Sequence, residues 1–382
     1  MTTRPVPVVI IGAGPTGIAA ATLLAQHGVQ SLVLERWESI YPQPRAVHLD
    51  DEIYRIVARL GVAEEFATIS RPSRGLRLVE PGARLLAEFP RHARGRHGYP
   101  EASMFDQPEL EALLRANLGR HHLARIQPNT EVTALTQHDT GPLRVECTNR
   151  IDGSRQTILA DYVLGCDGAN SITRDSIGTT MRDLRFQQRW LVVDITTDTD
   201  LGQWEGVHQV CDPHRAGTYM RVSTTHHRWE FQLLPGETVD DYRQIDQLHP
   251  LIAPWTGTIR TDQLAIMRVA EYTFHAQLAD RWRDRQVFLL GDAAHLTPPF
   301  IGQGMGAGIR DAMNLAWKLA GVLRGDLPAT VLDTYQTERK PHVHTMIRRA
   351  KLMGIAMTGG GQTGSLIRRI VAPRLQHLSR LR

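Results

Sequence analysis

Three glycines near the N-terminus have the spacing of a phosphate-binding turn: Gly12, Gly14 and Gly17. They follow the apolar run Val8 to Ile11. The first glycine permits a tight turn, the second lets backbone N–H groups approach a diphosphate, and the third lets a helix pack closely on a sheet. Glu35 ends a second apolar run 23 residues after Gly12, where a carboxylate binds ribose hydroxyls. These residues predict a site for an adenine dinucleotide with an unphosphorylated ribose.

Acidic residues also close two later apolar runs. Asp167 and Asp292 each stand at the end of a strand-like segment. Pro298 and Pro299 follow Asp292, and the glycine-rich segment from Gly302 to Gly306 then leads into a helical stretch. An acid that closes an apolar strand has little packing reason to be there. We therefore expect Asp292 to bind a ligand.

The elements that must position these residues change in character along the chain. A βαβ unit comes first, a β-rich region follows, and helices end the sequence. The β-rich region alternates as half-buried antiparallel strands do: Arg144 to Thr148, Trp190 to Thr196, Gly217 to Ser223 and Arg228 to Leu234. Helices are expected at Leu110 to Leu118, at about Gly304 to Leu323 and around Leu332 to Met353.

The chain length favours more than one domain, because single cores stop growing at about 250–300 residues and this chain has 382. The predicted class is α/β, mixed with α+β: a Rossmann-type nucleotide-binding domain, an inserted antiparallel-sheet domain and C-terminal helices. The first domain is predicted at residues 1–70, 100–182 and 284–345, and the second at 71–99 and 183–283. Residues 346–382 form a basic helical tail in this division.

Charge and cysteine content exclude several classes of protein. The formal net charge is +4, but no acid follows Glu338, while ten Lys or Arg lie between Arg339 and Arg382. This basic tail lacks interleaved aromatic residues, so we expect docking on acidic protein surface rather than nucleic acid or membrane. No apolar run approaches the ~20 residues that span a bilayer, and a cytoplasmic protein is expected. Three cysteines without a CxxC pair predict neither disulfides nor zinc, and no metal is expected.

The ordered motifs resemble those of FAD-dependent aromatic hydroxylases of the para-hydroxybenzoate hydroxylase superfamily. The resemblance is sharpest to the 3-(3-hydroxyphenyl)propionate hydroxylase branch and extends to about Met346. The segments that carry it are Tyr41 to Val47, Asp50 to Glu52, Phe105 to Pro108, Leu191 to Asp194, Cys211 to Pro213 and Pro235 to Thr238. Many relatives continue into a thioredoxin-like C-terminal domain, which we do not expect here.

The resemblance implies the residues that hold FAD. They are Gly12, Gly14, Gly17, Glu35, Arg36, Arg45, Gln107, Asp167, Asp292, Gly304, Met305 and Gly306. By this resemblance Glu35 and the first three glycines bind the ADP half, and Arg36 and Arg45 lie near adenosine, diphosphate or ribityl groups. Gln107 contacts the ribityl or ring region and Asp292 the ribityl hydroxyls. The helix start at Met305 meets the N1/C2 carbonyl edge of the flavin, where the helix dipole stabilises negative charge.

The chemistry implied by the resemblance is oxygen insertion through a flavin C4a-hydroperoxide, which needs an electron-rich phenolate. Pro299 borders the reactive face. No base stands out, and the candidates for the substrate pocket are His48, Tyr219, Arg221 and His226. Arg221 is also a candidate partner for a substrate carboxylate. His295 is expected to be structural.

The predicted function is therefore hydroxylation of a small aromatic substrate with O2 and transiently bound NADH or NADPH. Hydroxyphenylpropionate-like acids are the first substrate class. The alternative is a related oxygenase for a larger aromatic polyketide or antibiotic, acting by epoxidation, oxidative decarboxylation or inactivation. A more distant alternative is a flavin or ligand-binding protein without turnover. A homodimer is a further possibility.

Overall fold

The glycine-rich turn joins a buried parallel strand to a helix. In the computed structural model, which describes residues 4–82, 84–212 and 214–358, strand β1 (Val6–Ile11) pairs in parallel with β2 (Ser31–Leu34) and β11 (Arg155–Gly165). The last four residues of β1 are all buried. A parallel strand covered on both faces is apolar throughout rather than alternating, which explains the run Val8 to Ile11.

This strand is central to the first of two large sheets. Its neighbours are mostly parallel, and an antiparallel hairpin extends β11. In spatial order the sheet contains β17 (Arg283–Asp284), β18 (Val287–Leu289), β11, β1, β2 and β8 (Ala124–Gln127), with β10 (Leu143–Asn149) paired to β11 and β9 (Thr130–Thr136) paired to β10.

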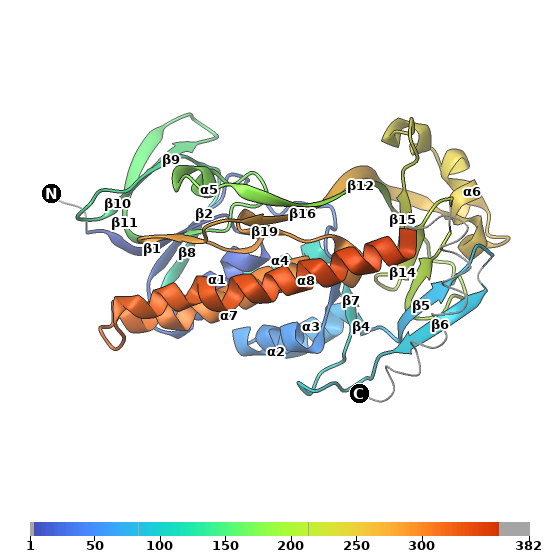
Figure 1. Cartoon of the computed structure of the whole chain (residues 1–382), viewed down its shortest axis with the longest axis horizontal. Helices are drawn as coiled ribbons and strands as arrows, with labels where there is room; N and C mark the ends of the chain where they lie inside the picture. The colour runs from blue at the N-terminus through green and yellow to red at the C-terminus, as the bar shows by residue number, and fades with distance from the viewer. Residues whose placement is uncertain (1–3, 83, 213, 359–382) are drawn as a thin grey trace.

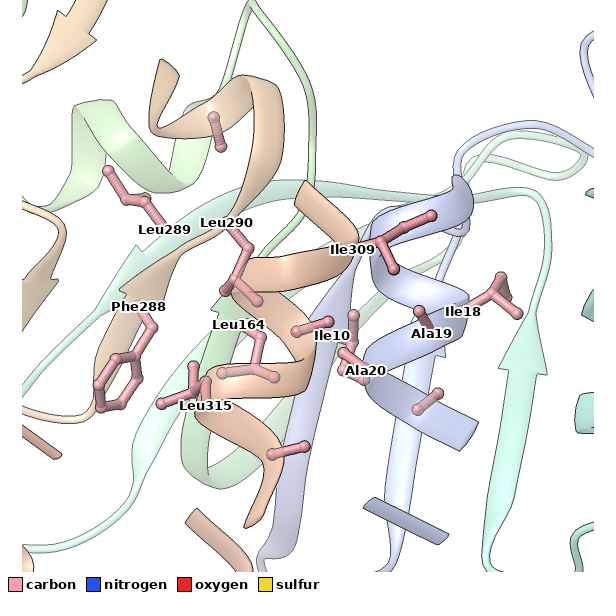
Figure 2. Packing of buried hydrophobic residues seen from close by; sticks show 14 of the residues in the cluster. Ile10, Ile18, Ala19, Ala20, Leu164, Phe288, Leu289, Leu290, Ile309 and Leu315 are labelled. Carbon is pink, nitrogen blue, oxygen red and sulfur yellow. The ribbon is translucent and has the colours of Figure 1, made fainter. Parts of the chain in front are cut away.

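Two helices pack together over this sheet: α1 (Pro15–Gln26) and α7 (Gly304–Leu323). Figure 2 shows Ile309 of α7 beside α1, and Ile10 and Leu164 from the strands belong to the same buried cluster. The helices approach closely at Gly308, where a Cβ atom would lie 2.2 Å from Thr16 Oγ1. This packing sets the starts of both helices beside the carboxyl ends of the strands.

The second large sheet is almost entirely antiparallel and lies at the other end of the molecule (Figure 1). Its long strands β12 and β16 run toward the first sheet (Figure 1). In spatial order it contains β19 (His295–Leu296), β16 (Ala265–Ala279), β12 (Met181–Thr196), β15 (His226–Gln232), β14 (Gly217–Arg221), β13 (Val207–Val210), β5 (Gly75–Val79) and β6 (Leu85–Pro90).

Smaller elements connect the two sheets. A three-stranded sheet contains β3 (His48–Leu49), β7 (Ser103–Phe105) and β4 (Ser70–Pro72). The other helices are α2 (Asp51–Leu60), α3 (Ala63–Ile69), α4 (Gln107–Leu118), α5 (Ile172–Ser176), α6 (Ile245–Thr256) and α8 (Thr334–Thr358). Short 3-10 turns include η3 (Gly291–Ala293), η4 (Pro299–Ile301) and η5 (Ala329–Asp333). Helix α6 covers the outer face of the second sheet, where apolar side chains of β12 and β15 form a second core.

Helix α8 runs alongside α7 and continues toward the second sheet (Figure 1). It contacts the turn η4 near its end, where a Cβ atom on Gly354 would lie 2.6 Å from the ring of Phe300. The predicted docking of the basic tail concerns residues 359–382 above all, and these lie outside the described residues.

The mixed α/β class predicted from the sequence is confirmed. The predicted strands and helices are present with shifted bounds. The helix expected from Leu110 begins at Gln107, and the strand expected at Trp190 to Thr196 is the end of β12, which begins at Met181. The proposed domain boundaries stay a prediction, although residues 75–90 do pair with the second sheet as that division requires.

Candidate functional site

The turn after β1 has the geometry that a dinucleotide diphosphate requires. Gly12 has φ = +102°, and a Cβ atom there would lie 2.4 Å from the Cys166 carbonyl oxygen. A Cβ atom on Gly17 would lie 2.0 Å from the Gly12 oxygen. Gly14 differs because no atom lies within 4 Å of its Cβ position. Only Gly14, the N-cap of α1, therefore leaves open space in front of the helix N-terminus, where an anion binds favourably.

Glu35 braces this turn from the end of β2. Its carboxylate accepts hydrogen bonds from the Ala13 N–H at 2.8 Å and the Trp37 N–H at 3.0 Å. Each oxygen keeps a second lone pair, which a ribose hydroxyl can use. Arg36 is exposed, and its guanidinium lies 5.4 Å from the Trp37 ring centroid.

Arg115 is a residue of this region that sequence reasoning missed. One of its Nη atoms donates to the Ala13 carbonyl at 3.1 Å, while its buried Nε has no hydrogen-bond partner in the part of the chain that the structure describes. A cation with an unused donor beside the glycine turn fits the diphosphate of a dinucleotide. Its position on α4, eight residues after Gln107, offered no local signal.

Asp292 is the acid with free acceptors. It follows β18 in the turn η3, is exposed, and makes no hydrogen bond or ion pair with the described residues. Partial removal of water by the surrounding protein raises the pKa of Asp292, and the nearby His295 and Arg45 lower it by less. Such a carboxylate fits the hydroxyls of a ribityl chain.

Asp167 differs from Asp292 because both of its carboxylate oxygens already accept hydrogen bonds from the protein. One oxygen accepts from Ser171 Oγ at 2.6 Å, and the other accepts from the Thr173 N–H at 3.0 Å. These bonds fix the start of α5. The structure thus favours a bracing role for Asp167, whose Oδ1 keeps one lone pair beyond its bond to Ser171.

Gln107 positions the loop that carries Arg45. Its Oε1 accepts from the Ala46 N–H at 2.5 Å, and its Nε2 donates to Glu111 Oε1 at 2.6 Å. Arg45 is half exposed, with an Nη atom 3.7 Å from the same Glu111 oxygen. Gln107 therefore fixes this loop, and its amide keeps one N–H and one oxygen lone pair that a cofactor can use.

The start of α7 is open in the same way as the start of α1. No atom lies within 4 Å of the Cβ position of Gly304, whereas a Cβ atom on Gly306 would lie 3.0 Å from Ile53. The N-terminal N–H groups of this helix, near Gly304 and Met305, have no capping side chain. The donor set at both helix starts, with Arg115 and Asp292, fits a flavin dinucleotide.

His48 lies against the loop that precedes α7. Its Nδ1 is buried with no hydrogen-bond partner of good geometry among the described residues, and a Cβ atom on Gly302 would lie 2.7 Å from it. Burial lowers the pKa of His48, although the neighbouring Asp50 raises it. The imidazole is thus neutral near pH 7, beside the η4 turn that contains Pro299.

The structure corrects the placement of Tyr219. The side chain is fully buried in the second core, and its Oη lies 3.0 Å from His227 Nδ1. It stacks against Trp255 of α6 at 5.7 Å. Tyr219 therefore points to the outer face of the sheet and lines no substrate site.

Arg221 is also placed differently from the expectation. It lies on the same face as Tyr219, and its guanidinium donates to Glu205 Oε1 at 3.0 Å and to the Thr224 carbonyl at 2.7 Å. These bonds leave it no role as a free partner for a substrate carboxylate. The alternation of the strand was predicted, but which residues face the first sheet was not.

The opposite face, which includes Met220 of β14 and Val222 just after it, carries an apolar group. Met220 and Val222 are buried with Val47 from the Arg45 loop and with Met104 from β7. Because Val47 immediately precedes His48, this apolar group adjoins the loop that packs against η4.

His226 is buried rather than solvated, and it joins two carboxylates. Its Nδ1 lies 2.6 Å from Asp106 Oδ1, and its Nε2 lies 2.8 Å from Asp194 Oδ1. Burial opposes the charged form, but hydrogen bonds to Asp106 and Asp194 outweigh burial and raise the pKa of His226.

Arg228 extends this network to the loop that carries Arg45. It donates to Asp194 Oδ1 at 2.7 Å, and its two Nη atoms donate to the carbonyls of Arg45 and Pro44, each at 2.7 Å. Arg268 lies 3.2 Å from the other Asp194 oxygen. Sequence reasoning missed Asp194, Arg228 and Arg268 in this role, since their partners lie on other strands.

His295 is structural, as expected. Its Nε2 lies 2.7 Å from Asp311 Oδ2, and Asp311 Oδ1 accepts from Arg339 Nε at 2.8 Å. All three side chains are buried. Among residues 4–358 as described, we find no helix long and apolar enough to span a membrane, and no group of three or more potential metal-binding side chains.

Comparison with known proteins gives one family for most of the chain. A family model described as "FAD binding domain" matches residues 5–350. A curated relative from Rhodococcus jostii (strain RHA1), "Probable NADH-specific resorcinol 4-hydroxylase", is 37% identical over 93% of this chain. A 3-(3-hydroxy-phenyl)propionate/3-hydroxycinnamic acid hydroxylase from Burkholderia cenocepacia (strain HI2424) is 35% identical over 91%. The chain spans just under two thirds of these relatives, 66% and 63% of their lengths.

Solved structures share the fold. Aklavinone-11 hydroxylase, solved with FAD and aklavinone, has a TM-score of 0.84 and 26% identity, covering 95% of this chain and 71% of that one. The p-nitrophenol 4-monooxygenase from Pseudomonas putida DLL-E4 has a TM-score of 0.88 and 22% identity, covering 98% of this chain and 96% of that one.

Proposed function

We propose that this chain, which belongs to the FAD binding domain family, is an FAD-dependent monooxygenase that hydroxylates a phenolic ring with NAD(P)H and O2. The observation that carries the proposal is the likeness, over more than nine tenths of the chain, to two relatives named as hydroxylases of phenolic compounds. The site supports it, because two open helix starts and an unpartnered acid converge at the carboxyl ends of the parallel strands.

In this proposal, each site residue binds a different part of FAD. Gly14 and Arg115 hold the diphosphate, and Glu35 holds the adenosine ribose. Asp292 accepts from the ribityl hydroxyls, and the start of α7 at Gly304 donates to the pyrimidine edge of the flavin ring. FAD, when bound, supplies electron transfer from NAD(P)H and the activation of O2.

The substrate region lies between the Arg45 loop and the inner face of the second sheet. Apolar residues such as Met220 exclude water there. We propose two substrate classes, resorcinol-like diols and hydroxyphenylpropionate-like acids. Diols come first, because Arg221 is already paired with Glu205 and the inner arginines Arg228 and Arg268 share Asp194.

The test is to purify the protein, measure bound FAD from its yellow absorbance, and follow O2 uptake with NADH and a panel of phenols. We expect resorcinol to stimulate O2 uptake and to give a product heavier by one oxygen atom. NADPH in place of NADH establishes the preferred donor. A protein that binds no FAD after reconstitution would contradict the assignment, whereas FAD binding without turnover would favour a ligand-binding role.

A second candidate is oxidation of a larger aromatic polyketide. The likeness to aklavinone-11 hydroxylase, with 26% identity and a TM-score of 0.84, favours it. Stimulation of O2 uptake by a polycyclic phenol, with none by single-ring phenols, would identify this case. We also propose a cytoplasmic location, where NAD(P)H is available. Homodimer formation stays a prediction, to be checked by mass in solution.

A further inference from the structure

The strand β15 presents Glu230 to the inner face of the second sheet. Its residues alternate: His227 and Trp229 are buried on the outer face, with Tyr219 and the α6 core. His226 and Arg228 point the other way and contact Asp106 and the Arg45 loop. Because strand side chains alternate with a period of two, Glu230 lies on the inner face with Arg228.

Along β15, Glu230 lies between a residue that contacts the Arg45 loop and a residue beside the η4 turn. On one side Arg228 holds the Pro44 and Arg45 carbonyls. On the other side Gln232 pairs with Trp190 of β12, and the Trp190 ring lies 5.6 Å from the Phe300 ring in the η4 turn. Glu230 therefore lies in the interval between the Arg45 loop and the turn that contains Pro299.

Glu230 is partly exposed at the surface of the sheet and makes no hydrogen bond or ion pair with the described residues. Its neighbours across the ladder are Val192 on β12 and Thr218 on β14. Val192 offers no polar group, and Thr218 Oγ1 donates to Gln209 Oε1 at 2.8 Å. The strands therefore position this acid but leave its oxygen atoms free.

Three charged groups act on Glu230: Arg228 on its own strand, Asp194 on β12 and Arg268 on β16. Asp194 is shared by Arg228 and Arg268, and the Arg268 guanidinium lies 5.2 Å from the Tyr272 ring centroid. Burial raises the pKa of Glu230, and the negative Asp194 adds to this, against the opposing effect of the two arginines. A raised pKa brings a carboxylate closer to the range in which general bases work best.

We propose that Glu230 is the catalytic base that binds the phenolic hydroxyl of the substrate and accepts its proton. This proposal rests on the proposed function. The phenol O–H bond breaks, its proton bonds to a Glu230 carboxylate oxygen, and the electron pair stays on the phenol oxygen. No electron is lost or gained in this step. The resulting phenolate is the electron-rich ring that oxygen insertion requires.

This role also limits the substrate. An ionised Glu230 repels a carboxylate placed beside it and accepts from a hydroxyl instead. A diol presents such hydroxyls without an added negative charge. The inner face therefore selects a neutral phenol at this position, in agreement with the ranking of diols above.

The first test is Glu230→Gln in the FAD-loaded protein. We expect kcat/KM for resorcinol-stimulated O2 uptake to fall by about 10²-fold or more, the usual contribution of a general base. The wild type should lose activity as the pH falls through the raised pKa of Glu230, and this limb should be absent in the variant. Glu230→Asp should restore part of the rate. The matched control is Glu271→Gln, whose carboxylate pairs with Arg189 instead, and it should keep wild-type kinetics.

The second test needs no turnover. Without NADH, resorcinol is titrated into the loaded protein and binding is read from the flavin difference spectrum. Glu230→Gln should weaken resorcinol binding by about 10-fold or more, as for loss of a hydrogen bond to a charged group. Binding of 1,3-dimethoxybenzene, which has no hydroxyl, should be equal in both proteins. FAD content and melting temperature confirm that each variant is folded.

The outcomes separate the two proposals. If the wild type binds resorcinol through Glu230 but no phenol stimulates O2 uptake, the proposed function fails and Glu230 remains only a phenol-binding residue. If the wild type turns over and Glu230→Gln keeps its rate and pH profile, Glu230 is not the base. Equal binding of resorcinol by both proteins, or no binding by the wild type, also overturns the proposal.

Discussion

Asp106 and His226 lie 2.6 Å apart, Oδ1 to Nδ1, although 120 residues separate them in the chain. Asp106 immediately precedes α4, and His226 begins β15. The other ring nitrogen of His226 faces Asp194, which in turn holds Arg228 against the Arg45 loop. One imidazole thus joins the nucleotide-binding half of the molecule to the buried ion network of the second sheet.

This contact predicts a stability that depends on pH. Only a doubly protonated imidazole donates to both carboxylates, and these bonds hold the pKa of His226 above 6.5 despite burial. The stabilisation is fully present below the unfolded pKa, near 6.5, and is lost as pH rises through the folded pKa. The difference in unfolding free energy between wild type and His226→Gln should therefore shrink as pH rises. Urea unfolding at several pH values measures it, and a constant difference would contradict it.

Arg228→Met should be strongly destabilising. It removes one partner of the buried Asp194 and both donors to the Arg45 loop, and such breaks of buried pairs cost about 3–5 kcal/mol. The unfolding free energy from urea denaturation tests this. The exposed pair of Arg260 and Asp262 is the control, because Arg260→Met should cost about 0–1 kcal/mol. Similar losses in both variants would argue against the buried network.

The glycines of the N-terminal turn should separate folding from cofactor binding. Gly17→Ala places a Cβ atom 2.0 Å from the Gly12 oxygen, so the FAD-free protein should lose about 1–3 kcal/mol of stability, as overpacking does. Gly14→Ala meets no protein atom within 4 Å and should leave the FAD-free melting temperature nearly unchanged while FAD affinity falls. Thermal unfolding and FAD titration of the apoproteins measure both. Unchanged FAD affinity in Gly14→Ala would remove Gly14 from the site.

Asp292→Ala should weaken FAD without unfolding the protein. The carboxylate has no partner among the described residues, so its loss breaks no internal bond. Loss of hydrogen bonds to ribityl hydroxyls should lower FAD affinity by about 10-fold or more. Calorimetric titration of FAD into the apoprotein checks this, with the exposed Asp262→Asn as control. Equal affinities would show that Asp292 does not hold the ribityl chain.

The local part of the site was predictable from the sequence. Gly12, Gly14 and Gly17 act within one turn, so their spacing carries the information, and Glu35 follows the same βαβ unit. Asp292 was recognisable because an acid at the end of a buried strand has no packing function. In each case the residues that constrain one another are close along the chain.

The substrate side depended on tertiary structure. Tyr219 and Met220 are neighbours on one strand and both are buried, so the sequence pattern predicted a strand without deciding which face is inner. His226 and His227 show the consequence: two carboxylates raise the pKa of His226, whereas burial lowers the pKa of His227 to about 3. The network around Asp194 joins strands that are distant in sequence. The carboxylates and the cations of this network come from separate parts of the chain. Their charges are therefore neutralised only when those parts come together in the folded protein.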